Sequence, residues 1–345
     1  MGLILFILFA ILCVLSFIEE YFDDRTKFAL LLLLGFFMAL VAGFRPADID
    51  NDYAAYVDMY YRSFSITTEP TFLFIVSFVQ FVCDDVVLMF LIYALLAMIV
   101  CVRAIQKLTP LYFLSLMYYL ATFYLLHGMN QIRVAVAAGI FLLALPHLFD
   151  GNRKKYMLYI FFAILFHYSA AALLFLAVFN GKPLKKWQVY VLALAMPLAY
   201  LIYFLKINLF VAVPIPYFEE KIMAYQRLQD SGGQWDEINV FNLVFLARIA
   251  IFYFLLWKNR LITECNKYAA LLMKIEVLAL FAFVSLYVIP VLAIRLSELL
   301  AVVEIVLFPL LFYTLKPARY GRLLAVGVSF TLLLINLFYN KYILV

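Results

Sequence analysis

Long apolar runs separated by short polar segments repeat along the whole chain, and this pattern dominates the sequence. Such runs suit membrane helices, which need about 17–25 residues to cross roughly 30 Å of hydrocarbon. Apolar positions are continuous rather than alternating, which favours helices over the strands of a β-barrel. The pattern predicts an all-α, polytopic integral membrane protein with about ten full transmembrane helices, near 2–18, 28–44, 86–103, 109–127, 131–149, 187–205, 239–257, 268–290, 293–315 and 322–340.

The composition agrees with this class. The 345 residues are 68% hydrophobic and 14% charged, with a mean hydropathy of +1.05, whereas soluble domains are nearer half apolar. The first run has no preceding basic residues and no small-residue cleavage site, so we expect a retained span rather than a signal peptide. The four cysteines lack metal-site or CxxC spacing and are typical of small core residues. No repeat or linker divides the chain, which predicts a single domain over 1–345 without a metal or other cofactor.

Two apolar segments, 70–83 and 156–179, do not fit as simple spans. All basic clusters can face the cytoplasm together only if each segment enters and leaves on one side. We therefore predict an interfacial or re-entrant helix at 70–83 and a broken hairpin at 156–179, with Phe166–Ser169 near its apex; a single span is the alternative. This topology puts segments near 45–69 and 206–238 on the periplasmic side. The net charge of +5 then belongs to cytoplasmic loops and does not indicate nucleic-acid binding.

Three arginines, Arg45, Arg133 and Arg295, stand on the predicted outer side next to apolar helices. Their polar neighbours are Asn130, Gln131 and Glu298. A structural interpretation exists, because Arg133 would reach the headgroups and Arg295 would form an ion pair one turn along its helix. The functional interpretation is a shared anion site, since helix N-termini offer free N–H groups and guanidinium groups bind phosphate bidentately.

Acidic and aromatic residues gather in the loop after the second run, where Asp48, Asp50 and Asp52 precede Tyr53 and Tyr56. Aromatic rings stack on the C–H faces of sugars, and carboxylates accept hydrogen bonds from sugar hydroxyls. The loop therefore suits a carbohydrate. A solvated acidic loop beside an interfacial aromatic belt is the alternative.

A single histidine, His167, lies inside the apolar stretch AILFHYSAAALL. Ionisable side chains within a membrane are costly and usually line a cavity, which favours a functional role over a structural one. A neutral histidine at this depth is a candidate general base, and Asp50 and Asp52 are the alternative candidates.

Charged residues in other predicted spans are interpreted as structural. Arg248 and Glu304 fall near the middle of separate spans, where mutual pairing is the simplest explanation. Lys274 and Glu276 are interpreted in the same way.

Four short motifs follow one another along the chain: an arginine followed by acids and DYxxY, a helix opening IRxxxA, an FHxS after an RKK turn, and a late RLxE. Their residues are Arg45, Asp50, Asp52, Tyr53 and Tyr56; Ile132, Arg133 and Ala137; Phe166, His167 and Ser169; and Arg295, Leu296 and Glu298. In their order and spacing, the motifs resemble those of the EpsG/Wzy group of polysaccharide polymerases. These are integral-membrane glycosyltransferases of bacterial O-antigen, capsule and exopolysaccharide assembly.

The resemblance implies an enzyme at the periplasmic face of the bacterial inner membrane that joins undecaprenyl-diphosphate-linked oligosaccharide repeat units. It implies that membrane lipid, a chain-length regulator and a flippase of the same pathway are partners. Independently of the resemblance, arginines can stabilise the negative charge of a departing lipid diphosphate without a metal. Within the second outer segment, Tyr225 and Arg227 become candidates for a substrate-contacting lid. A lipid-linked sugar transporter or flippase and an O-antigen ligase are the alternatives.

Overall fold

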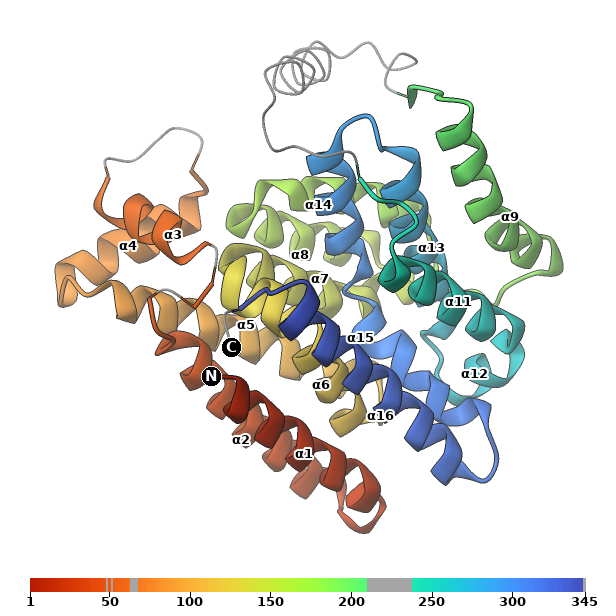
Figure 1. Ribbon diagram of the computed structural model, residues 1–345, viewed down its shortest axis with the longest axis horizontal. Coiled ribbons are helices and arrows are strands. Elements are labelled where there is room, and N and C mark those ends of the chain that lie inside the picture. Colours follow the sequence, from red (N-terminus) through yellow and green to blue (C-terminus); the bar gives the residue numbers. More distant parts are fainter. Residues whose placement is uncertain (48, 51, 63–67, 210–237, 344–345) are drawn as a thin grey trace.

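The computed structural model describes residues 1–47, 49–50, 52–62, 68–209 and 238–343, which form an all-α fold (Figure 1). This confirms the predicted class. In chain order the elements are α1 (Gly2–Ile18), η1 (Glu19–Tyr21), α2 (Asp24–Gly43), α3 (Tyr53–Tyr61), α4 (Pro70–Val82), α5 (Val86–Leu108), α6 (Tyr112–Ala121), the π-helix η2 (Tyr124–Asn130), α7 (Ile132–Phe149), α8 (Arg153–Phe166), the 3₁₀ helix η3 (Tyr168–Val178), α9 (Lys186–Phe204), α11 (Leu243–Trp257), α12 (Asn259–Cys265), α13 (Ala269–Ser285), α14 (Pro290–Ala301), α15 (Glu304–Leu307), η5 (Phe308–Thr314), α16 (Ala318–Leu334) and η6 (Ile335–Tyr339).

Among the described residues, six helices are long and apolar enough to cross a membrane, where the sequence predicted about ten spans. They cover Gly2–Tyr21, Asp24–Gly43, Val86–Leu108, Ile132–Phe149, Lys186–Phe204 and Ala318–Tyr339. The other four predicted spans contain shorter or interrupted helices. The chain is thus a polytopic membrane protein, but with fewer uninterrupted spans than the hydropathy pattern predicted.

The breaks in these helices are short, and the backbone groups released there form other hydrogen bonds. Helix α6 ends at Thr122, whose ψ of −86° is not helical, and the π-helix η2 follows. The released carbonyl of Ala121 accepts a hydrogen bond from Asn336 Nδ2 at 2.8 Å. Non-helical backbone at membrane depth requires such partners, and π-helical turns occur frequently at functional sites. The widened turn carries His127 and Asn130 toward the interior of the bundle.

The segment 150–181 forms a hairpin, which supports the predicted broken hairpin over the single span. His167 has extended backbone angles (φ −155°, ψ 115°) and separates α8 from η3. Two hydrogen bonds bring the ends together: Tyr156 Oη donates to the Leu173 carbonyl at 2.7 Å, and Gly181 N donates to the Phe149 carbonyl at 3.3 Å. The chain therefore returns to the point from which it left, with His167 at the far end of the hairpin.

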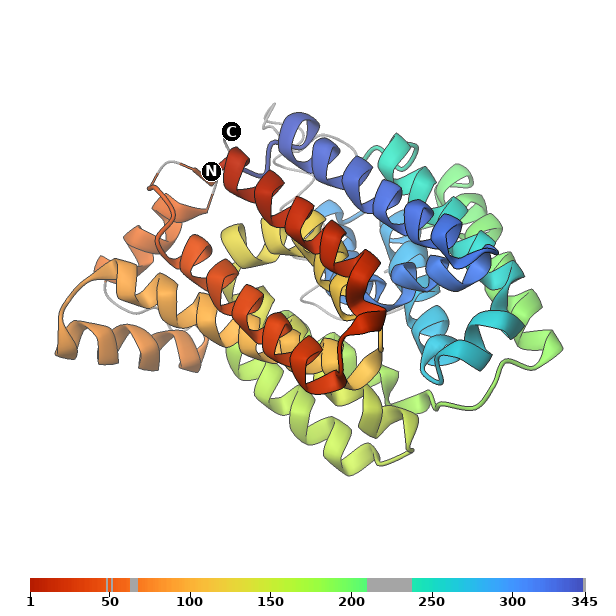
Figure 2. The same ribbon diagram turned by 90° about the horizontal axis from the view of Figure 1, so that it is seen from below.

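Helices α3 and α4 lie at one end of the molecule and α9 at the opposite end, with the buried helices α5, α6 and α7 between them (Figures 1 and 2). Helices α1 and α16 run side by side in Figure 2, where the rings of Phe9 and Phe330 are 5.4 Å apart. The two chain ends lie close together. Ile343 makes an isolated β-bridge to Asp50, so the C-terminal segment covers the loop between α2 and α3.

A buried charge cluster joins α11, α13, α15 and α6. Arg248 Nε lies 2.6 Å from Glu304 Oε1, and Tyr118 Oη donates to Glu304 Oε2 at 2.6 Å, which confirms the predicted Arg248–Glu304 pair. The guanidinium also lies 3.7 Å from Glu276. Glu276 and Lys274, which the sequence also predicted to be structural, have separate partners, because residues two apart on a helix do not face each other.

Replacing Arg248 by Met is expected to destabilise the protein by about 3–5 kcal/mol, because two buried carboxylates lose their counter-charge. Thermal unfolding in detergent would measure the loss. The matched control is the double variant Arg248→Met/Glu304→Gln, which removes one of the stranded charges and should recover part of the stability. An unchanged unfolding temperature in the single variant would contradict a paired cluster.

Candidate functional site

A polar cavity of about 200 Å³ lies where the hairpin apex, α7, α14 and the loop before α3 meet. Helix α8 packs against α7, and η3 contacts both α7 and α14. The lining is unusually polar for a chain that is 68% hydrophobic. It consists of Asp52, Tyr56, His127, Gln131, Arg133, Val134, His167, Ser169, Arg295, Glu298 and Leu299. Residues that are far apart in the sequence, from Asp52 to Leu299, thus line one small cavity.

Most of the candidate residues predicted from sequence meet in this cavity. They are Asp52, Tyr56, Gln131, Arg133, His167, Arg295 and Glu298. Four other candidates, Arg45, Asp50, Tyr53 and Asn130, do not line it. Tyr225 and Arg227 lie outside the described residues.

Arg45 and Asp50 form an ion pair beside the cavity rather than in it. Arg45 Nε lies 2.5 Å from Asp50 Oδ2, and both side chains are fully buried. The Arg45 guanidinium stacks 4.3 Å from the Phe90 ring, on which Tyr53 also stacks. The structure therefore places Arg45 and Asp50 in a closed ion pair next to the cavity, with the half-buried Tyr53 beside them, and none of the three lines the cavity.

The same ion pair sets the position of a cavity residue. Asp50 Oδ1 accepts a hydrogen bond from the backbone N–H of Asp52 at 3.0 Å. The remaining candidate, Asn130, donates through Nδ2 to the carbonyls of Leu125 at 2.9 Å and Tyr342 at 2.8 Å. These contacts fix the position of the backbone around the cavity. Arg45, Asp50 and Asn130 therefore support the cavity without lining it.

Sequence reasoning missed Glu69, which joins two cavity residues. It is only 4% exposed, and its carboxylate forms an ion pair with Arg133 and accepts a 3.1 Å hydrogen bond from His167 Nδ1. Glu69 precedes Pro70 at the start of α4. The available signal was an acid and a proline opening an apolar helix, which on its own indicates only a helix N-terminus.

The environment of Glu69 determines the tautomer of His167. Burial alone would raise the pKa of Glu69, but the hydrogen bond from His167 and the charge of Arg133 together hold it below its usual value. An ionised carboxylate only accepts hydrogen bonds, so Nδ1 of a neutral His167 carries the proton. Nε2 is then the basic nitrogen. A carboxylate that orients a histidine in this way is the usual support of a general base.

The two arginines of the cavity differ in their partners. Arg133 is paired with Glu69 and lies over the Tyr56 ring at 5.4 Å and the Phe72 ring at 5.5 Å. Arg295 is exposed, and no carboxylate among the described residues lies within ion-pair distance of it. Arg295 is therefore the cation that is available to an incoming anion.

His127 is a second cavity residue that sequence reasoning did not select. It is 1% exposed, and neither ring nitrogen has a hydrogen-bond partner among the described residues. Glu298 Oε2 is unpartnered in the same sense. Buried polar atoms are normally paired, so this cavity can supply hydrogen bonds to a polar ligand.

Asp52 is a cavity carboxylate whose pKa is raised by its surroundings. Its burial, followed by the nearby charge of Asp50, raises its pKa above the ordinary value despite the opposing arginines. The folded protein thus binds this proton more tightly than the unfolded chain, and stability falls as pH rises through the window between the two pKa values.

Asp52→Asn is therefore expected to be more stable than the wild type at pH 7, where the buried carboxylate is charged. The difference should be smaller at pH 4, because the raised pKa lets the folded wild type hold more of this proton at low pH than at pH 7. Thermal unfolding at both pH values would measure this. Asp58→Asn is the control, because Asp58 is more exposed and pairs with Arg62 at 2.6 Å. A gain of equal size at both pH values would contradict a carboxylate with a raised pKa.

Across the described residues, no cluster of three or more His, Cys, Asp or Glu side chains could hold a metal ion. The fold and the cavity define a polytopic membrane protein with a small, charged internal site suited to an anionic, hydroxyl-bearing ligand. The chain belongs to the EpsG family, whose model matches residues 28–344. This family is associated with exopolysaccharide synthesis. We found no match among curated proteins or solved structures.

Proposed function

We propose that the protein is a polysaccharide polymerase that joins undecaprenyl-diphosphate-linked oligosaccharide repeat units at the periplasmic face of the bacterial inner membrane. The observation that carries this proposal is the meeting of Arg295, Arg133 and His167 in one polar cavity, with Glu69 bonded to both Arg133 and His167. Membership of the EpsG family supports the pathway. The cavity supports the chemistry, because it combines a cation for a leaving diphosphate with a base for an acceptor hydroxyl.

The reaction balances without a metal. The acceptor hydroxyl oxygen attacks the anomeric carbon of the donor sugar while the bond from that carbon to the lipid diphosphate breaks. The diphosphate leaves with the electron pair, and Arg295 stabilises its developing charge. The hydroxyl proton passes to His167 Nε2, and Glu69 stabilises the imidazolium that forms. Arg133, held by Glu69, contributes further positive potential.

The size of the cavity favours bond formation over translocation. Its volume of about 200 Å³ lies below the roughly 300–1,000 Å³ of typical pockets for small molecules. It therefore suits the reacting sugar–phosphate junction, with the remaining sugars outside. A flippase would need room for the whole oligosaccharide. The cavity thus supports the polymerase over the transporter alternative.

The deciding experiment is reconstitution of the purified protein in lipid nanodiscs with a lipid-diphosphate-linked repeat unit. A polymerase should convert the single repeat into a ladder of longer lipid-linked chains, without added metal and in the presence of a chelator. His147→Ala is a suitable control variant, because His147 lies on α7 outside the cavity, where its ring packs 5.1 Å from that of Tyr159. Transfer only to a lipid A core acceptor would identify a ligase instead. Movement of the intact unit across the bilayer without elongation would identify a flippase.

A further inference from the structure

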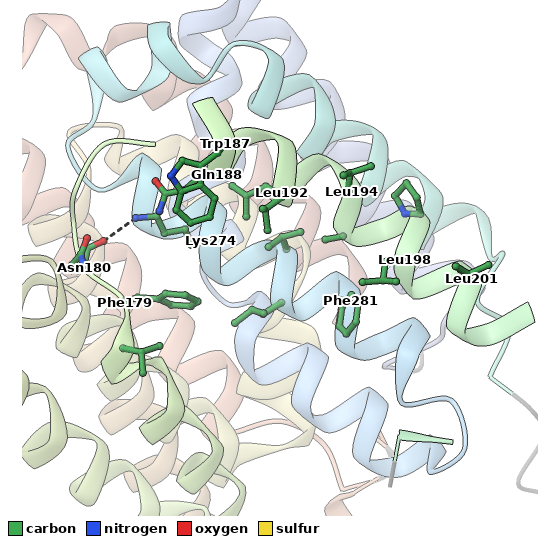
Figure 3. Close-up of a pocket in the computed structure, with 16 residues that line it drawn as sticks. Phe179, Asn180, Trp187, Gln188, Leu192, Leu194, Leu198, Leu201, Lys274 and Phe281 are labelled. Carbon is green, nitrogen blue, oxygen red and sulfur yellow. Dashed lines mark hydrogen bonds between the residues drawn. The ribbon is translucent and has the colours of Figure 1, made fainter. Parts of the chain in front are cut away.

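A long apolar groove lies between α9 and α13, on the opposite side of the bundle from α3 and α4 (Figures 1 and 3). Its volume is about 900 Å³. Figure 3 shows Leu192, Leu194, Leu198 and Leu201 of α9 along one wall, with Phe281 of α13 across from them. From Trp187 to Leu201 the helix rises about 21 Å, at 1.5 Å per residue. The groove therefore exceeds the length of one leaflet, which is half of the roughly 30 Å hydrocarbon core.

One end of the groove contains a buried cation. Lys274 is 7% exposed, and its Nζ donates to the carbonyls of Asn180 and Lys182, each at 3.1 Å (Figure 3). No carboxylate in the described part of the chain lies within ion-pair distance of it. An ammonium group has three donors, so one remains beyond these two carbonyls. A buried charge without a counter-charge favours an anionic ligand.

The surroundings of this end are also basic. Lys182, Lys185 and Lys186 are exposed on the segment that leads into α9, and the exposed Trp187 follows them. The sequence from 151 to 218 contains no Asp or Glu. The positive-inside rule assigns this end to the cytoplasmic side, where tryptophan and lysine are typical of the membrane interface. The groove thus has apolar walls along its length and a positively charged end.

We propose that this groove binds an anionic glycerophospholipid, with an acyl chain between α9 and α13 and the phosphodiester beside Lys274. Basic pockets between transmembrane helices at this membrane face characteristically hold anionic headgroups. The lipid would also complete the packing of α9, which is the least buried of the six spanning helices. This site is separate from the polar cavity and does not depend on the reaction proposed there.

Trp187 provides a direct probe, because it lines the groove and the chain has only two other tryptophans. The variant Trp235→Phe/Trp257→Phe leaves Trp187 as the single fluorophore. In nanodiscs, brominated phosphatidylglycerol should quench Trp187 at a lower lipid fraction than brominated phosphatidylcholine does. Adding Lys274→Met should weaken the phosphatidylglycerol effect about fivefold, the expected contribution of one lysine beside an anionic headgroup.

Lys107→Met is the control, since it removes a lysine that is exposed on the same predicted side but does not line the groove, and it should leave the lipid preference unchanged. Ala195→Phe keeps Lys274 but narrows the groove, so it should reduce quenching by both lipids. Equal quenching by the two lipids in the single-tryptophan protein would overturn the proposal even if Lys274→Met did not fold. Displacement of phosphatidylglycerol by equimolar polyprenyl phosphate would also overturn it, because the groove would then hold the lipid carrier.

Discussion

Replacing His167 by alanine is expected to slow the joining of repeat units by about 10²–10⁴-fold, the usual contribution of a general base. The proposed base is Nε2, because Nδ1 faces Glu69 at 3.1 Å. His167→Gln keeps a hydrogen-bonding side chain but cannot accept the proton, so it should be nearly as slow. The initial rate of chain growth in nanodiscs is the measurement, and His147→Ala should retain the normal rate.

Two outcomes would change this assignment. If His167→Gln is nearly normal while His167→Ala is slow, the imidazole positions the acceptor and does not take its proton. If both variants work normally, His167 is structural. Asp52 then becomes the better candidate base, since it lines the cavity whereas Asp50 is enclosed in its ion pair with Arg45.

The role of Glu69 can be separated in the same assay. Glu69→Gln can still accept the Nδ1 hydrogen bond, so it should retain more activity than Glu69→Ala. Glu69→Ala removes the acceptor of the Nδ1 hydrogen bond, so the orientation of the imidazole and the tautomer that leaves Nε2 basic are no longer held. A purely structural Glu69 would reduce the amount of folded protein but leave the initial rate per folded molecule equal in the two variants.

Replacing Arg295 by alanine is expected to lower the rate by about 10²–10³-fold, as removal of one donor to a developing negative charge does. Arg295→Lys should recover only part of the rate, because lysine retains the charge but loses the planar fork that contacts two oxygens. Folded yield should stay normal, since Arg295 is exposed.

Arg103→Ala is the control for this prediction. Arg103 is an exposed arginine of α5 that contacts Gln106 and the Phe28 ring. It does not line the cavity. It should polymerise at the wild-type rate. Full activity of Arg295→Ala would contradict diphosphate binding by this residue, and full rescue by lysine would reduce its role to that of a simple charge.

The membrane class and the broken hairpin could be predicted from the sequence because both depend on local chemistry. Apolar runs must be helical in hydrocarbon, where backbone groups have no water to bind. The basic residues around 153–155 and 182–186 require both ends of the hairpin to stay on one side. The cost of an ionisable group within the membrane pointed to His167, and the position of Arg133 and Arg295 at helix starts pointed to an anion site. All three line the cavity.

Only the tertiary structure decided which charges face the cavity and which face each other. Arg45 and Arg133 look alike in the sequence, yet Arg45 is enclosed with Asp50 while Arg133 pairs with Glu69, 64 residues away. Only one residue separates Lys274 from Glu276 in the sequence, yet the two side chains contact different partners. Hydropathy and charge patterns record the cost of burying each group, whereas the partner that offsets this cost is set by the packing of distant helices. Packing therefore brought Glu69 to Arg133 and His167 and enclosed Arg45 beside the cavity.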